Sequence, residues 1–220
     1  MNQKGLVDRE GKPKDAFYVF KSYWSKQPFT YIESHSWTER QGPKEKSRDI
    51  SVYSNCPEVE LFLNNKSLGI KKRNPLEFPA AGLNWTLNFK EGENNLKAIG
   101  KTKYDQQVID ELKLNYRFVK NGKARRLELE STALEDNNYL ITATAFDKNG
   151  LRCLDYEERV YFQCLNGGKA LVSQGTPLGS EVIEMANGQA SIKVKRNSNT
   201  QPLLMMVLNQ SFKGTYLEIE

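Results

Sequence analysis

The sequence contains one histidine, in the segment Ser34-His-Ser-Trp37, and it is the first residue to test for catalytic chemistry. A single histidine supplies neither the ligand set of a zinc site nor, by itself, a Ser-His-Asp arrangement. The sequence also lacks a Gly-x-Ser-x-Gly turn that would expose a nucleophilic serine. We therefore expect His35 to be structural, with its imidazole bonded to a backbone carbonyl or a carboxylate. In that arrangement the Trp37 indole fills an interface between a helix and a β-sandwich.

The three tryptophans are the second group to test, because aromatic rings supply the platform on which a sugar ring stacks. Trp85 lies in a segment of alternating apolar residues, which predicts that it faces a core. The carbohydrate-contact candidates are then His35, Trp37 and Trp24. For Trp24 and Trp37, the favoured interpretation is packing in a core or between domains, and sugar binding is the alternative.

Acidic clusters give no metal site. Asp105 with Asp110, and Glu135 with Asp136, lack the Asp-x-Asp-x-Asp-Gly spacing of a calcium loop. We interpret all four as solvated turn carboxylates, and we expect no metal and no cofactor.

The cysteines are three in number and lack metal-ligand spacing. One interpretation is that Cys153 and Cys164 face each other across a sandwich. Buried free thiols, with Cys56 included, are the favoured one.

Charge and hydropathy exclude two classes of partner. Lys and Arg number 32 against 27 Asp and Glu, and the resulting +5 is spread over short groups such as 44–48 and 71–73. A nucleic-acid surface requires stronger clustering, so we interpret the charges as a solvated surface and expect no nucleic-acid partner. No apolar run approaches the ~18 residues of a membrane span, so we expect no membrane insertion.

One helix is predicted near the start of the sequence, ending at Trp24. Pro13 fits a first helical turn, and apolar residues then recur at spacings of three and four. This stripe consists of Ala16, Phe17, Phe20, Tyr23 and Trp24. Several bulky apolar side chains on one short helix need a surface, which either the following sandwich or a missing part of the protein supplies.

The rest of the sequence reads as strands separated by turns at intervals of about ten residues, which favours immunoglobulin-like antiparallel β-sandwiches. Asn64-Asn65 is a candidate two-residue hairpin turn, because asparagine tolerates positive φ. The polar segment 119–124 separates two sets of strands. The prediction is a mainly β chain with a short helical segment at 1–26, a first sandwich at 27–119 and a second at 120–220.

The opening segment resembles the last strand-to-helix stretch of the catalytic barrel in glycoside hydrolase family 2, in particular β-galactosidase-like members from Bacteroidetes-type bacteria. The matching residues are Gly5-Leu-Val-Asp8, Gly11, Pro13-Lys-Asp-Ala-Phe17 and Tyr23-Trp24. The following segments are similar to the sandwich after the barrel and to a C-terminal immunoglobulin-like module, the latter through Asp147-Lys-Asn-Gly150, Arg159-Val-Tyr-Phe162, Asn187-Gly188 and Gly175-Thr-Pro177. Thr176 departs from the aspartate common in that last tripeptide.

This resemblance implies that 1–26 is the end of a (β/α)8 barrel and that the catalytic groups lie elsewhere. Retaining glycosidases use two carboxylates about 5 Å apart, and no glutamate of this sequence falls in a motif of that kind. We therefore expect non-catalytic accessory domains that support the catalytic barrel of a β-galactosidase, with no catalytic residue in this chain. The expected partner is that barrel, with an oligosaccharide as a second candidate.

Two other functions stay open. An independent carbohydrate-binding module would use the exposed aromatics, and an adhesin-like surface domain would leave the aromatic helix without a use. If the sequence belongs to such a glycosidase, we expect a periplasmic or secreted parent whose signal lies outside this chain. If the chain is the accessory part of a glycosidase, His35 has an alternative role in shaping the rim of the parent's active site.

Overall fold

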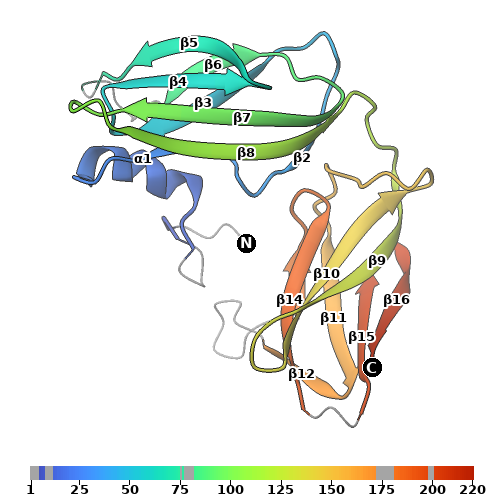
Figure 1. Cartoon of the computed structure of the whole chain (residues 1–220). Coiled ribbons are helices and arrows are strands. Elements are labelled where there is room, and N and C mark those ends of the chain that lie inside the picture. Colours follow the sequence, from blue (N-terminus) through green and yellow to red (C-terminus); the bar gives the residue numbers. More distant parts are fainter. Residues whose placement is uncertain (1–4, 8–11, 75, 77–81, 172–180, 198–200) are drawn as a thin grey trace. The chain divides into compact units, whose positions relative to one another are not determined.

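A computed structural model describes residues 5–7, 12–74, 76, 82–171, 181–197 and 201–220 of the 220-residue chain. The chain divides into two units, residues 2–120 and residues 121–220 (Figure 1). Among the described residues, the first unit contains a helix and eight strands and the second contains eight strands.

The helix α1 and strands β1–β8 make up the first unit. Their bounds are α1 Asp15–Trp24, β1 Thr30–Ile32, β2 Glu39–Gln41, β3 Arg48–Ser54, β4 Glu58–Leu63, β5 Lys66–Lys72, β6 Leu83–Leu87, β7 Gly92–Lys101 and β8 Gln107–Arg117. The strands form a three-stranded sheet in the order β1-β3-β6 and a five-stranded sheet in the order β2-β8-β7-β4-β5. Alternating burial along β3, β7 and β8 turns one face of each sheet toward a shared core.

The core of the first unit draws apolar residues from both sheets. Its most deeply buried members include Ile50, Val52 and Trp85 from the smaller sheet and Leu61 and Leu96 from the larger one. Trp85 is only 3% exposed, and its Nε1 donates to the carbonyl of Gly69 at 3.2 Å. The core position predicted from its alternating neighbours is confirmed.

The turn between β4 and β5 confirms a second prediction. Asn64 and Asn65 have φ values of 50° and 66°, the left-handed conformation that a two-residue hairpin turn requires at both positions. Leu63 pairs with Lys66 across this turn, and after a register shift between Phe62 and Glu60 the pairing extends to Glu58 opposite Lys72.

One strand pair differs from the predicted antiparallel arrangement. β2 runs parallel to β8, with Glu39 opposite Asn115 and Gln41 opposite Arg117. A parallel neighbour needs a long crossover, and β2 and β8 are separated in sequence by five intervening strands. Hydrophobic alternation reports which residues face the core and carries no information about strand direction, so this pair was not foreseeable.

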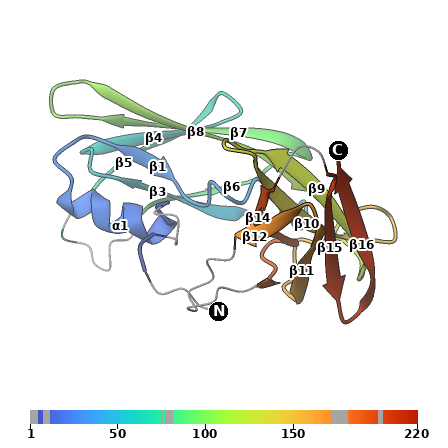
Figure 2. The ribbon, with the colours of Figure 1, turned by 90° about the horizontal axis from the view of Figure 1, so that it is seen from below.

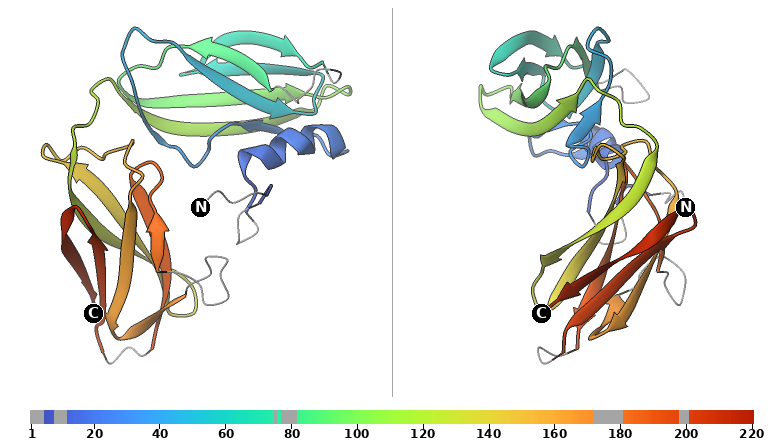
Figure 3. Two further views of the ribbon diagram at one scale, coloured as in Figure 1. Left: turned by 180° about the vertical axis from the view of Figure 1, so that it is seen from behind. Right: turned by 90° about the vertical axis from the view of Figure 1, so that its right-hand side faces the viewer.

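Strands β9–β16 make up the second unit. Their bounds are β9 Ala124–Ala133, β10 Asn138–Asp147, β11 Arg159–Asn166, β12 Gly168–Leu171, β13 Val182–Glu184, β14 Gln189–Arg196, β15 Leu203–Asn209 and β16 Phe212–Ile219. They form two four-stranded antiparallel sheets in the orders β12-β14-β10-β9 and β13-β11-β15-β16. Figure 3 shows these sheets from two further sides.

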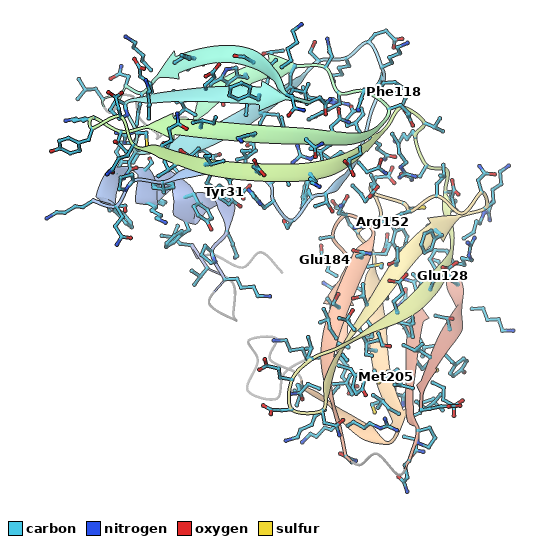
Figure 4. The ribbon with its side chains drawn as sticks, in the orientation of Figure 1. Tyr31, Phe118, Glu128, Arg152, Glu184 and Met205 are labelled. Carbon is cyan, nitrogen blue, oxygen red and sulfur yellow. The ribbon has the colours of Figure 1, made fainter. Side chains whose placement is uncertain are left out.

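A second core lies between these two sheets. Ile141 and Val194 on one sheet and Phe162 and Met205 on the other are all nearly inaccessible to solvent. Figure 4 labels Met205 within this unit. The predicted class is confirmed: the chain is mainly β, and its described residues form two sandwiches and one short helix.

The cysteines carry free thiols. Cys56 and Cys153 are buried and Cys164 is half-buried, so the interpretation as free thiols is confirmed and the alternative of a Cys153–Cys164 disulfide is wrong. Within the described ranges, no helix has the length and apolar character needed to cross a membrane.

Candidate functional site

The helix α1 carries the predicted apolar stripe and one of the three carbohydrate-contact candidates, Trp24. It begins at Asp15, after an extended Lys14, and ends at Trp24, where Ser25 is extended and its N–H bonds the carbonyl of Lys21 at 2.9 Å. An acidic residue in the first turn stabilises the positive end of the helix dipole. α1 lies beside β3 (Figure 2).

The face that α1 turns to the sandwich is not the predicted apolar stripe. Ser22 is the one buried residue of the helix, whereas Phe20 is 39% and Trp24 is 67% exposed. Their rings stack on each other, with centroids 5.2 Å apart and planes inclined by 28°. Most of the stripe is therefore open on this chain, and the helix is attached by polar contacts and by the stacking of Tyr18 on Tyr31.

Asp15 makes the main polar contacts of α1. Its Oδ1 accepts from the Tyr31 hydroxyl at 2.9 Å, and its Oδ2 accepts from the backbone N–H of Ser34 at 2.8 Å and from the Ser34 hydroxyl at 3.2 Å. Ser34 has a φ of 62°, which is uncommon for a residue with a side chain. One carboxylate thus ties the first turn of the helix to β1 and to the loop after it.

Three rings stack beside this carboxylate. Tyr18 of α1 lies on Tyr31 with centroids 3.5 Å apart and planes within 5° of parallel, and Tyr31 lies against His35 at 4.7 Å. Figure 4 shows Tyr31 next to α1. Burial, the hydrogen bond to Asp15 and the charge of that carboxylate raise the pKa of Tyr31 well above that of a free phenol. Tyr31 therefore remains a neutral donor.

His35 is held by a carboxylate on the five-stranded sheet. Its Nε2 lies 2.7 Å from Oδ2 of Asp110 on β8, and the same oxygen accepts from the backbone N–H of Ile32 at 2.7 Å. The sequence predicted a bond from the imidazole to a carbonyl or carboxylate, and this contact is of that kind. The Asp110 carboxylate, interpreted from sequence as a solvated turn group, is instead half-buried and links β8 to β1.

Trp37 does not occupy the position expected from the sequence. Its side chain is 54% exposed, so the expectation that the indole fills an interface between helix and sandwich is wrong. The Trp37 carbonyl accepts from Arg40 Nε at 2.9 Å, and Arg40 Nη2 reaches the Ser34 carbonyl at 3.3 Å. Burial lowers the pKa of Arg40, while the charges of Glu33 and Asp15 oppose that shift. Arg40 thus stabilises the loop backbone through these two carbonyls, while the Trp37 indole remains exposed to solvent.

The three carbohydrate-contact candidates do not form one surface by direct contact. His35 is engaged by Tyr31 and Asp110, and Trp24 stacks with Phe20. In the part of the chain that the structure covers, no ring contact joins Trp24 to Trp37. Sequence reasoning missed Asp15 as an organising residue, although an acid in the first turn of a predicted helix was visible.

The side chains of this site have a structural role. Asp15 accepts three hydrogen bonds and Oδ2 of Asp110 contacts two partners, and in the described part of the chain none of these partners is a second carboxylate. Among the residues described, no group of three or more His, Cys, Asp or Glu side chains is placed to hold a metal ion. What this network does is fix α1 and the loop 33–37 on the first sandwich.

The motif Asp147-Lys-Asn-Gly150 in the second unit is also structural. Asp147 is buried. Its Oδ1 accepts hydrogen bonds from the backbone N–H groups of Asn149 at 2.8 Å and Leu151 at 2.9 Å. Its Oδ2 accepts a hydrogen bond from the backbone N–H of Gly122 at 2.8 Å. The carboxylate closes its own turn and anchors the start of the unit. The Gly175-Thr-Pro177 loop lies outside the described residues.

Comparison with known proteins places this architecture in an enzyme family. Residues 45–109 match the model of a domain of unknown function, DUF4982. Over all 220 residues the chain is 74% identical to a putative beta-glucuronidase of Formosa agariphila, and over 184 residues it is 29% identical to the beta-galactosidase BoGH2A of Bacteroides ovatus. The chain is a C-terminal region of a glycoside hydrolase family 2 enzyme.

A solved structure agrees with this assignment along the whole chain. The beta-glucuronidase of Parabacteroides merdae is 36% identical, with a TM-score of 0.89 over 100% of this chain and 28% of that one. The present chain spans 27% of the Formosa relative and 20% of the Bacteroides ovatus relative. It is thus a non-catalytic C-terminal part of a family 2 glycosidase, as the motif resemblance implied.

Proposed function

We propose that the chain is the accessory C-terminal part of a glycosidase that acts on β-glucuronides. The observation that carries this proposal is the 74% identity, over all 220 residues, to a putative beta-glucuronidase. The Parabacteroides merdae beta-glucuronidase supports it through similarity over the full chain. The beta-galactosidase relative is more distant, at 29% identity over 80% of the chain, so glucuronide replaces the galactoside that the motifs implied.

In this proposal, residues 1–26 are the end of the catalytic barrel, and α1 is the element shared between barrel and sandwich. Asp15, Tyr18 and Ser22 attach the helix to the first sandwich, which leaves Phe20 and Trp24 for the barrel. Burying a large apolar side chain contributes about 1.5–3 kcal/mol. The exposed pair then stabilises the junction between the barrel and the accessory domains, and the parent's barrel is the partner.

The direct test uses the full-length parent enzyme and the 220-residue chain side by side. We expect the parent to hydrolyse 4-nitrophenyl β-glucuronide faster than the β-galactoside, and we expect the chain alone to hydrolyse neither. Faster turnover of the galactoside by the parent contradicts the proposed substrate class. Hydrolysis by the isolated chain contradicts its non-catalytic role.

The junction is tested with Trp24→Ala and a matched control, Tyr104→Ala. Tyr104 is 87% exposed in the turn between β7 and β8 and carries a comparably large ring. We expect Trp24→Ala to lower the Tm of the parent by several degrees without changing the Tm of the isolated chain, and Tyr104→Ala to change neither. Equal effects of the two substitutions in the parent contradict burial of Trp24 against the barrel.

The second candidate function is an independent carbohydrate-binding module. The specific observation in its favour is the exposed, stacked pair of Phe20 and Trp24, because such rings suit the apolar face of a sugar. Affinity electrophoresis of the chain in gels containing a neutral galactan or glucan tests it. Retardation that Trp24→Ala removes supports this function, and unchanged mobility in every gel at millimolar sugar rejects it.

A further inference from the structure

Two lysines face each other directly on the second unit. Lys169 on β12 is the cross-strand partner of Lys195 on β14, and both side chains are exposed. Their neighbours Ala170 and Val194 are buried, so the two lysines lie on the outer face of the sheet. Directly opposed residues have Cβ atoms about 5 Å apart, and like charges in such a pair are destabilising.

A third lysine continues the same face. Lys193 lies two residues before Lys195 on β14, and its cross-strand partners are Leu171 on β12 and Leu140 on β10. Lys193 is half-buried, so we call the two exposed lysines, Lys169 and Lys195, the lysine face. Lys169 and Lys195 come from different strands, so the strand pairing and not the sequence brings them together.

The carboxylates of this sheet lie away from the lysine face. Glu128 and Glu130 on β9 point outward opposite Thr144 and Thr142, so the whole of β10 separates them from β14. Glu128 is paired with Arg126 at 2.7 Å. Within the described part of the chain, no ion pair joins Lys169 or Lys195 to a carboxylate, so their charges remain available to a partner.

We propose that the lysine face binds an acidic carbohydrate chain that carries uronate carboxylates. The inference rests on the proposed function, because an enzyme acting on β-glucuronides meets substrates of that charge. Charge complementarity supplies the physical argument, since an anion between Lys169 and Lys195 converts their repulsion into two attractive contacts. Leu140 and Leu171 add apolar surface for the less polar face of a sugar ring. The face thereby holds polymeric substrate on the accessory part of the enzyme.

The test measures binding to the 220-residue chain by calorimetry at low and at physiological ionic strength. The probes are an oligomer of glucuronic acid, a neutral glucose oligomer of the same length and a short DNA duplex. The variant is Lys169→Gln with Lys195→Gln, and the control is Lys44→Gln with Lys46→Gln, which removes the same charge from a loop of the first unit. We expect the glucuronate oligomer to bind, with Kd raised at least tenfold in the variant and less than twofold in the control.

A further variant separates loss of binding from loss of folding. Lys195→Glu places opposite charges across β12 and β14, so we expect a higher Tm together with lost binding. Binding of the neutral oligomer as tight as that of the acidic one overturns the proposal, as does equal weakening by both double variants. Binding of DNA without the glucuronate oligomer also overturns it. Because these measurements need no hydrolysis, they fail or succeed independently of the parent's activity on glucuronides.

Discussion

Removing the Asp15 carboxylate should release α1 from the first sandwich while leaving the sandwich folded. The carboxylate accepts three hydrogen bonds, from the Tyr31 hydroxyl and from the backbone N–H and hydroxyl of Ser34. No large apolar side chain of α1 is fully buried to compensate for their loss. Asp15→Ala therefore tests whether the helix is attached by polar contacts.

The magnitude follows from the number and kind of contacts. A hydrogen bond to a charged group contributes about 1.5–3 kcal/mol, but two of the three come from one residue, Ser34, and Asp15 is half-buried. The interaction of Asp15 with the helix dipole adds about 0.3–1 kcal/mol. We expect the docking free energy of α1 to fall by about 2–4 kcal/mol in Asp15→Ala and by roughly half of that in Asp15→Asn, which keeps one acceptor oxygen.

Hydrogen exchange resolved by peptide is the suitable assay, because it separates local opening of α1 from global unfolding. A loss of 2 kcal/mol corresponds to about a 30-fold faster exchange of the α1 amides. Amides of β4 and β7, in the centre of the larger sheet, should exchange at the wild-type rate. The matched control is Asp49→Ala, which removes a carboxylate that accepts from Thr86 on the exposed side of β3 and β6.

Three outcomes would refute this reasoning. Unchanged exchange of α1 in Asp15→Ala would mean that the aromatic stack of Tyr18 on Tyr31 holds the helix alone. Equally accelerated exchange of α1 and the central strands would mean that the helix and the sandwich unfold as one unit. An effect of Asp49→Ala on α1 as large as that of Asp15→Ala would show that the response is not specific to the anchoring carboxylate.

Three further predictions concern titration, the core and the thiols. Because the native pKa of Tyr31 is raised above the ordinary value of 10.0, its contribution to stability is complete below pH 10 and is lost as the pH rises beyond it; urea denaturation between pH 9 and 11.5 should show this decline, and Tyr31→Phe should reduce its slope. Trp85→Ala should cost about 3–5 kcal/mol in urea denaturation of the isolated chain, whereas Trp24→Ala should stay within about 0.5 kcal/mol; similar losses would contradict the burial of one and exposure of the other. In the native chain, a thiol reagent should modify Cys164 slowly, since burial raises its pKa, and should reach the other two thiols only after unfolding; rapid modification of all three would contradict their burial.

The strands and the core were accessible from sequence because they depend on local alternation. Trp85 sits among alternating apolar residues and is buried, and Asn64-Asn65 marks a hairpin through the φ values that asparagine tolerates. The parallel pairing of β2 with β8 was inaccessible, because it depends on which distant strand edge is free when the sheet assembles. The free state of the cysteines followed from their burial and spacing.

The candidate site was harder to foresee, because long-range contacts decide it. The helical period of α1 was correct, but the period alone did not show that Asp15, Tyr18 and Ser22 would face the sandwich while Trp24 stayed open. The bond between His35 and Asp110 spans 75 residues, so the sequence indicated the type of partner and not its identity. The opposition of Lys169 to Lys195 likewise arises only from strand register.

The polar attachment of α1 affects what bulk unfolding experiments can detect. Heat-capacity changes and denaturant slopes both scale with the surface exposed on unfolding, and apolar surface dominates the heat capacity. Ser22 is the one buried residue of this helix, and the apolar contacts of the helix with the sandwich come from half-buried side chains such as Tyr18, so its detachment exposes less apolar surface than the unfolding of a sandwich core. A calorimetric trace or a urea curve of this chain would therefore be dominated by the unfolding of the two sandwiches. A normal melting curve would not show whether α1, which carries Trp24, is still attached to the first sandwich.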